Sequence, residues 1–201
     1  MAPKDGTWEA HYEWTLDSVV LAGEVVLPDD KLGVGDPAWS FEGLSLELRI
    51  APGQYPVYIA IACAVLEDAQ VRRNCAVAEL RIDEPSLVSK WELVPATLRT
   101  GERGGFWTEG GSSFGPAALL ASGPPEWDLL DPVAPTPPWW FTYDTTVPGP
   151  QAGQAVAFSV GPQHQECITF VGRTSDERVV SVITDLGLLD LDPRHQPLPW
   201  H

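Results

Sequence analysis

The stretch "GPQHQEC", residues 161–167, brings His164, Glu166 and Cys167 close together in the sequence. A cysteine with a histidine nearby is the smallest combination that can supply a nucleophile and its base. A working pair also needs a group that orients the base and a site that stabilises an oxyanion, and no motif here announces either. A polar loop that leads into a strand beginning near Cys167 is the simpler interpretation.

Two carboxylates stand out by their positions, Asp36 in "GDP" and Asp185 in "ITDL". Both are expected at a turn or at a strand end, where an aspartate usually accepts hydrogen bonds from backbone N–H groups. No residue is therefore assigned a catalytic role. Asp36, His164, Cys167 and Asp185 form a candidate polar site only if the fold brings at least two of them into one pocket.

Aromatic residues offer a second kind of site, because the chain contains nine tryptophans. Exposed indoles can stack on the apolar faces of sugars, but most tryptophans, Trp91 among them, are expected to fill the core. Trp139, Trp140 and Phe141 differ, since they lie in the proline-rich residues 123–153. They are the candidate binding residues for a small ligand or a glycan.

No metal or cofactor site is predicted. Cys63, Cys75 and Cys167 are too few and too scattered for a disulfide scaffold or a zinc site with paired ligands. The glycines of "FWTEGGSSFG" match neither a phosphate loop nor a dinucleotide fingerprint. His195 and His201 in "DPRHQPLPWH" could hold a metal only adventitiously, because this segment is expected to be an exposed terminus.

The charge is strongly acidic, with 12 Lys and Arg against 28 Asp and Glu and a formal net charge of −16. It disfavours binding to nucleic acids and anionic membranes. The acidic residues either only keep the protein soluble or form a surface that attracts a basic partner protein. The first 20 residues contain no apolar core of signal-peptide length, and the longest apolar run, residues 57–66, is too short to span a bilayer. A cytoplasmic protein is therefore expected.

The secondary structure is predicted to be mainly β, because 18 glycines and 20 prolines leave little room for long helices. The short apolar runs between them are rich in valine, isoleucine and aromatic residues. Strands are predicted at residues 19–27, 44–50, 56–66, 74–82, 90–94, 155–160, 166–173 and 178–184. A short helix is expected around 117–121, capped by Ser112 or Ser113, with a second helical turn at 126–131.

A β-hairpin over residues 53–82 is the predicted centre of the fold. In an even register one face is wholly apolar; its members are Val57, Ile59, Ile61, Cys63, Val65, Ala76, Ala78, Leu80 and Ile82. An odd loop centred on Ala69 would instead place Cys63 opposite Cys75 and mix charged residues into the apolar face. The even register is therefore predicted, with the two cysteines as small buried hydrophobic residues on opposite faces.

The ordered series "GDP", "PGQYPVYIAIA", "CAVAELRI", "KWELV", "FWTEGGSSFGPAALL" and "CITFVGRTSDERVVSVITDL" resembles the bacterial family DUF4241, a domain family of unknown function. The likeness extends from Gly35 to Asp185. It implies a mainly β fold. The family brings no established reaction, so the resemblance carries no catalytic residues over to this chain.

These features together predict one mainly β domain over residues 1–201. It is built from antiparallel sheets packed face to face or from a strongly bent sheet, with one or two short helices at the edge. The proline-rich residues 123–153 are expected to be a loop insertion. The first expectation for function is a protein-interaction module, of an immunity or antitoxin kind, that masks a basic partner. A small-ligand or glycan-binding module is the second, and an enzyme of unrecognised type is the third.

Overall fold

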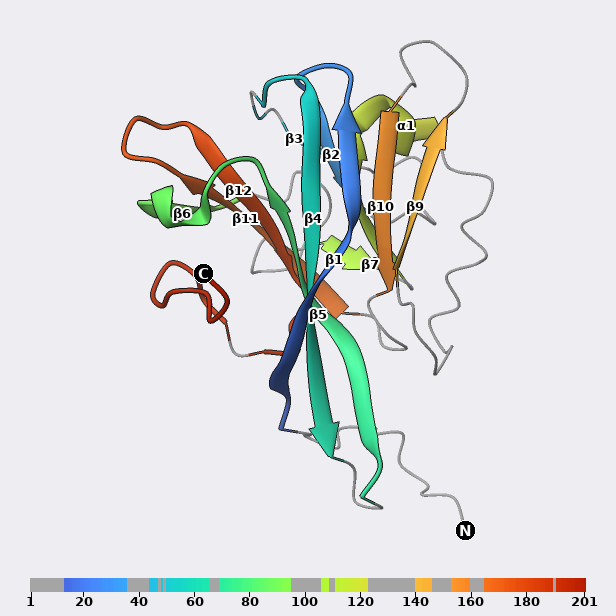
Figure 1. Cartoon of the computed structure of the whole chain (residues 1–201), viewed down its shortest axis with the longest axis vertical. Helices are drawn as coiled ribbons and strands as arrows, with labels where there is room; N and C mark the ends of the chain where they lie inside the picture. Colours follow the sequence, from blue (N-terminus) through green and yellow to red (C-terminus); the bar gives the residue numbers. More distant parts are fainter. Residues whose placement is uncertain are drawn as a thin grey trace.

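The computed structural model describes residues 13–35, 44–46, 48, 50–65, 69–94, 106–108, 111–122, 140–145, 153–159, 165–189 and 191–201. Strands dominate these residues (Figure 1). In chain order the elements are β1 (Thr15–Leu27), β2 (Leu32–Gly35), β3 (Leu44–Leu46), β4 (Gly53–Val65), β5 (Val71–Arg81), the 3-10 helix η1 (Pro85–Leu87), β6 (Lys90–Leu93), β7 (Phe106–Thr108), β8 (Gly111–Pro116), α1 (Ala117–Ser122), β9 (Trp140–Thr145), β10 (Gly153–Ser159), β11 (Gln165–Arg173) and β12 (Val179–Asp185).

The strands form one antiparallel sheet in the order β3-β2-β8-β10-β1-β4-β5-β12-β11-β6, with β7 added to β11 and β9 added to β10. This sheet curls strongly into a half-barrel. In Figure 1, β11 and β12 cross behind β4 at a steep angle, while β1, β4 and β10 run nearly side by side. The predicted mainly β fold, built on a strongly bent sheet with short helices, is confirmed.

Several short strands were missed or predicted with wrong boundaries. The predictions missed β2, β7, β8 and β9, and β3 ends at Leu46, before the predicted end at residue 50. Ser113 does not cap α1; it is buried in β8, and its hydroxyl donates a hydrogen bond to the carbonyl of Gly35 at 2.9 Å. The helical turn predicted at residues 126–131 lies outside the described residues.

The central hairpin of β4 and β5 changes register along its length. Val57 lies opposite Leu80 and Ile59 opposite Ala78, as the even register predicts, but a bulge follows and Ile61 lies opposite Cys75. Because side chains alternate along a strand, Cys63 then follows Ile61 onto the face that Cys75 shares. The prediction of one cysteine on each face was therefore wrong.

No disulfide joins the two hairpin cysteines, because the bulge pairs Cys63 with Arg73. Cys75 is 1% exposed, and burial raises the pKa of its thiol to about 12. Cys63 is only partly buried, with its sulfur 3.6 Å from the hydroxyl oxygen of Thr15. The expectation of small buried hydrophobic residues thus holds fully for Cys75 and partly for Cys63.

The buried side chains divide between the two faces of the sheet. The main cluster occupies one face and includes Val57, Leu80, Phe114 and Phe158. The second cluster occupies the other face; its members are Ala60, Val77, Phe170, Ile183 and Leu198, with Trp91, Leu191 and Trp200 packed against it. Leu198 and Trp200 come from residues 191–201, so this segment covers part of the second face.

Within the described residues, no helix has the length and apolar character needed to cross a membrane. The proline-rich residues 123–153, expected as a loop, include β9 and the first residue of β10. The sheet therefore continues inside this segment.

Candidate functional site

The predicted polar site is only partly described. Asp36 and His164 lie outside the described residues. Cys167 is fully buried in β11 and belongs to the main cluster, while Asp185, at the end of β12, lies opposite Ile168. Because Ile168 follows Cys167 directly in β11, strand alternation puts Cys167 and Asp185 on opposite faces of the sheet. The fold does not bring these two residues into one pocket.

Asp185 has a structural role that agrees with the expectation for a strand-end aspartate. Its carboxylate accepts a hydrogen bond from the backbone N–H of Gly187 at 2.9 Å. It is buried, with 6% of its surface exposed. This bond holds the chain as it leaves β12.

Only part of the predicted aromatic site lies within the described residues. Trp139 is outside the described residues. Trp140 and Phe141 open β9, where their backbones pair with Phe158 and Ala157 of β10. A role for these three aromatic residues in ligand binding stays a prediction.

Residues 191–201 do not form an exposed terminus, and that expectation was wrong. Leu198 is 2% exposed within the second cluster, and the side chain of His201 is 13% exposed. Both Trp200 and His201 contact Glu79, a carboxylate of β5 that is 1% exposed. The segment is therefore anchored to the sheet by apolar packing and by one buried carboxylate.

Glu79 is surrounded by hydrogen-bond donors. Its Oε1 accepts from the Ser181 hydroxyl at 2.9 Å and lies 2.7 Å from Nε2 of His201. Its Oε2 accepts from Nε1 of Trp200 and from the Arg81 guanidinium, each at 3.0 Å. Burial acts to raise the pKa of Glu79, but the hydrogen bonds and charges of His201 and Arg81 outweigh it and hold the pKa below its usual value.

Serine, histidine and glutamate are also the components of a hydrolytic triad, but their arrangement here is different. In a triad the serine donates to the histidine and the histidine to the carboxylate. Here Ser181 and His201 both bind the same oxygen of Glu79, and Ser181 is fully buried. The geometry is that of a satisfied buried carboxylate that fixes a segment of chain.

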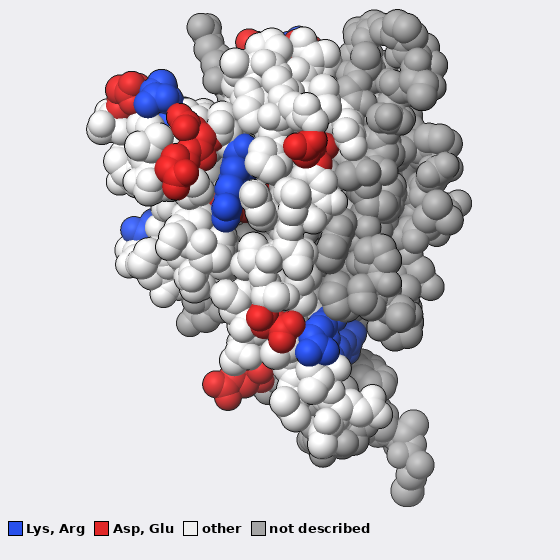
Figure 2. Space-filling view, in the orientation of Figure 1, with Lys and Arg blue, Asp and Glu red and all other residues white. Residues whose placement is uncertain are grey.

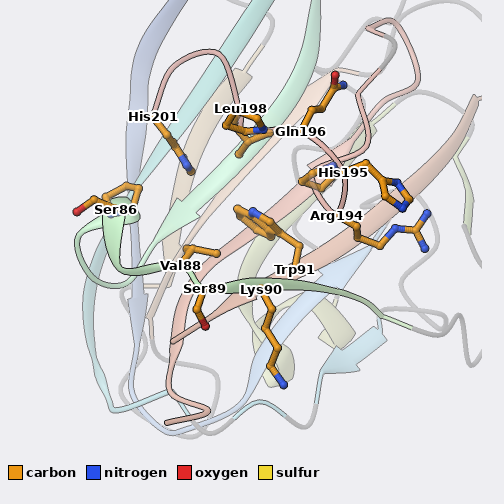
Figure 3. A pocket seen from close by; sticks show the side chains of 13 residues that line it. Ser86, Val88, Ser89, Lys90, Trp91, Arg194, His195, Gln196, Leu198 and His201 are labelled. Atoms are coloured by element: carbon orange, nitrogen blue, oxygen red, sulfur yellow. The ribbon is translucent and has the colours of Figure 1, made fainter. Parts of the chain in front are cut away.

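A groove lies beside this anchor, between β6 with the preceding turn and residues 193–201 (Figure 3). It is open to solvent, with a volume of about 380 Å³. The indole of Trp91 lies at the centre of the labelled side chains in Figure 3. The remaining lining residues are Pro85, Ser86, Val88, Ser89, Lys90, Pro193, Arg194, His195, Gln196, Pro197, Leu198 and His201. We call this feature the Trp91 groove.

The charges around the Trp91 groove are compensated by neighbouring residues. Lys90 Nζ lies 2.8 Å from Glu92 and 2.7 Å from Glu177, and both contacts raise the pKa of Lys90. Arg194 forms an ion pair with Asp192 at 2.7 Å and holds the pKa of that carboxyl well below its usual value. The arrangement suits the binding of a neutral molecule on an aromatic floor.

The sequence predictions missed the Trp91 groove, because its two walls are far apart in the chain. Trp91 was expected to fill the core, and it does pack against the second cluster while also lining the groove. One signal was present in the sequence. Glu79 interrupts the apolar run "CAVAEL", and a carboxylate inside a buried strand requires partners from elsewhere.

Among the described residues, no group of three or more His, Cys, Asp or Glu side chains is placed to hold a metal ion. Comparison with known proteins found no matching family model, curated protein or solved structure. The resemblance to DUF4241 stays a prediction.

Proposed function

We propose that this protein is an interaction module that binds a basic partner protein. The observation that carries the proposal is the formal net charge of −16 on 201 residues. A charge of this size attracts a positively charged partner over a long range and raises the rate of encounter. In the immunity-like or antitoxin-like role expected from the sequence, this binding would mask the basic surface of the partner.

The distribution of charge in the described residues supports this proposal. The cations Arg73, Arg81, Lys90, Arg173, Arg178 and Arg194 each form an ion pair with a carboxylate. On the face in Figure 2, blue side chains accordingly lie next to red ones. Exposed carboxylates such as Asp29, Asp30 and Glu84 add negative charge beyond these pairs. A partner rich in lysine or arginine would meet a surface on which six of the eight described lysine and arginine side chains are already paired.

The experiment is capture of partners by the tagged protein from a lysate of its own source, followed by kinetics with the purified partner. Binding is measured at ionic strengths of about 10 mM and about 1 M, where the Debye length falls from about 30 Å to about 3 Å. The proposal expects a basic partner whose association rate falls steeply as salt rises. A captured partner with salt-independent kinetics, or no partner at all, contradicts it.

A charge-neutralised variant makes the test specific. Replacing Asp29 and Asp30 by asparagine removes two exposed carboxylates of the β1–β2 turn while keeping side-chain shape. The association rate with a basic partner should fall, with little change in the dissociation rate. The matched control is Lys31→Gln in the same turn, which should raise the association rate if attraction between opposite charges is the cause.

Small-ligand binding is a second candidate function, and the Trp91 groove is the observation that favours it. Ligand sites are typically concave and combine apolar or aromatic surface with a few polar groups. This groove has both, with Trp91 and Leu198 beside Ser86, Ser89 and Gln196.

A further inference from the structure

The second face of the sheet is covered only in part. Residues 191–201 lie over it near β11 and β12, where Leu198 packs with Phe170 and Ile183. On β1 this cover ends, and Leu21 is 57% exposed in the middle of a 13-residue strand. β1 and β4 lie toward the viewer in Figure 1, and the same region of Figure 2 is mostly white. A stable sheet usually buries such a face against a second layer.

Strand pairing places Leu21 beside a tyrosine and a proline. Leu21 lies opposite Tyr58 in β4, and Glu24 lies opposite Pro56. Side chains alternate along β4, and Val57 belongs to the main cluster, so Pro56 and Tyr58 are on the second face. Both are half-buried. Leu21, Pro56 and Tyr58 form one largely apolar surface, which we call the Leu21 patch.

Two opposite charges flank the Leu21 patch at the same level of β4. The guanidinium carbon of Arg81 lies 4.0 Å from the centroid of the Tyr58 ring. Glu79 lies opposite Tyr58 and the strands are antiparallel, so Arg81, two residues further along β5, is level with Pro56. Glu24 is level with Pro56 on the other side, in β1. The patch therefore has a cation on its β5 side and a carboxylate on its β1 side.

Both flanking groups have an atom to offer to a partner. Within the described residues, Arg81 binds Glu79 through Nε and Nη2 and keeps Nη1 free. Glu24 accepts a hydrogen bond from Gln54 through Oε2 and keeps Oε1 free. A partner that matches the patch thus presents a carboxylate to Arg81 and a cation to Glu24, about two strand spacings apart.

We infer that the Leu21 patch is the contact surface of a homodimer. A two-fold axis that runs along β4 in the plane of the interface brings the patch of one copy against the patch of the other. It places Arg81 of each copy opposite Glu24 of the other copy, so one pair of residues forms two contacts. Tyrosine and arginine, which are prominent in the patch, contribute more than most residues to binding energy at interfaces.

A uniformly basic partner fits this patch less well, because Arg81 would repel it. The net charge of −16 opposes the homodimer at long range. At about 0.15 M ionic strength the Debye length is about 8 Å, so repulsion between remote carboxylates is largely screened. The homodimer should therefore strengthen as ionic strength rises from about 10 mM to about 0.15 M, whereas binding of a basic partner should weaken. The homodimer is thus independent of the partner binding proposed above.

The test is sedimentation equilibrium of the purified chain from about 1 μM to about 1 mM at both ionic strengths. A reversible monomer–dimer equilibrium is expected. Leu21→Ser removes apolar contact from both copies, and Glu24→Arg sets two cations against each other at both contacts. Each should raise the dissociation constant of the dimer at least about tenfold. Because Leu21 and Glu24 are exposed, the Tm of the monomer should change little.

The matched controls make the same changes outside the patch. Leu87→Ser removes a leucine of η1 that is 44% exposed. Glu84→Arg changes the net charge as much as Glu24→Arg does, at an exposed residue just before η1. Neither control should weaken the dimer. Glu84→Arg should slightly strengthen it, since it lowers the net negative charge.

Three results would overturn the inference. The first is a monomer at every concentration and both ionic strengths. The second is a dimer that Leu21→Ser and Glu24→Arg weaken no more than their controls do. The third is a monomeric chain in which Leu21→Ser weakens binding of a captured basic partner, which would assign the patch to that partner.

Discussion

Replacement of Glu79 by glutamine tests whether one buried carboxylate holds residues 191–201 on the sheet. The glutamine keeps the shape of the side chain but removes its charge. One carboxylate oxygen is replaced by an NH₂ group, which is a donor and must then face a donor such as the Ser181 hydroxyl or the Trp200 indole N–H. Removing one partner of a buried ion pair costs about 3–5 kcal/mol. Arg81 and His201 keep 23% and 13% exposure, so water relieves part of this cost. We expect a loss of about 2–4 kcal/mol in the free energy of unfolding.

The loss should appear in urea unfolding followed by circular dichroism, and as a fall in Tm of roughly 5–15 °C. Hydrogen exchange gives the local measurement, since the backbone amides of residues 195–201 should exchange faster in Glu79→Gln than in the unchanged protein. Glu92→Gln is the matched control, because Glu92 forms ion pairs with Lys90 and Arg173 but is 43% exposed. Exposed pairs contribute little. Equal destabilisation by the two variants, or unchanged exchange in residues 195–201, would refute the anchoring role of Glu79.

Three further predictions concern stability and reactivity. The pKa of Glu79 is lowered in the folded state, so the stability that its ionised form contributes is present above the unfolded pKa of about 4.3 and is lost as pH falls below it. Between about pH 5 and pH 3, the free energy of unfolding measured in urea should therefore fall more steeply in the unchanged protein than in Glu79→Gln. Gly172→Ala should lower the free energy of unfolding by about 1–3 kcal/mol, because its Cβ would overlap Trp91, and the NMR signal of the Trp91 indole N–H should shift. Cys75, with a pKa of about 12, should resist iodoacetamide in the folded protein while Cys63 reacts faster, as mass spectrometry of the alkylated peptides would show.

The sequence predicted the parts of the fold whose signal is local. Long apolar runs gave β1, β4, β5, β11 and β12 with small errors at their ends. The short strands β2, β7, β8 and β9 were missed, because they contain too few residues for alternation to stand out and their pairing is decided by the neighbouring strands. The hairpin register was right from Val57 to Ala60 and wrong from Ile61 to the tip, because a bulge after Ala60 shifts the pairing.

The Trp91 groove could not be predicted from a pattern along the sequence. Lys90 and Trp91 on one wall meet residues 193–201 on the other, more than a third of the chain later. The prediction that Trp91 is a core residue was half right, because its ring packs over Gly172 and against the second cluster while it also lines the groove. Only the pairing of β6 with β11, which places Trp91 opposite Gly172, explains why both descriptions hold.

The anchor and the groove are two parts of one arrangement. Glu79 does not line the Trp91 groove, but it binds His201, which does, and the ring of His201 stacks near Trp91 with a centroid separation of 6.3 Å. Residues 193–201 form a wall only while Leu198 and the bonds to Glu79 hold them on the sheet. A carboxylate buried at some cost in solvation is thus coupled to the shape of a site that it does not touch. That coupling gives a physical reason for a charged residue at position 79, in a strand that is otherwise apolar around it.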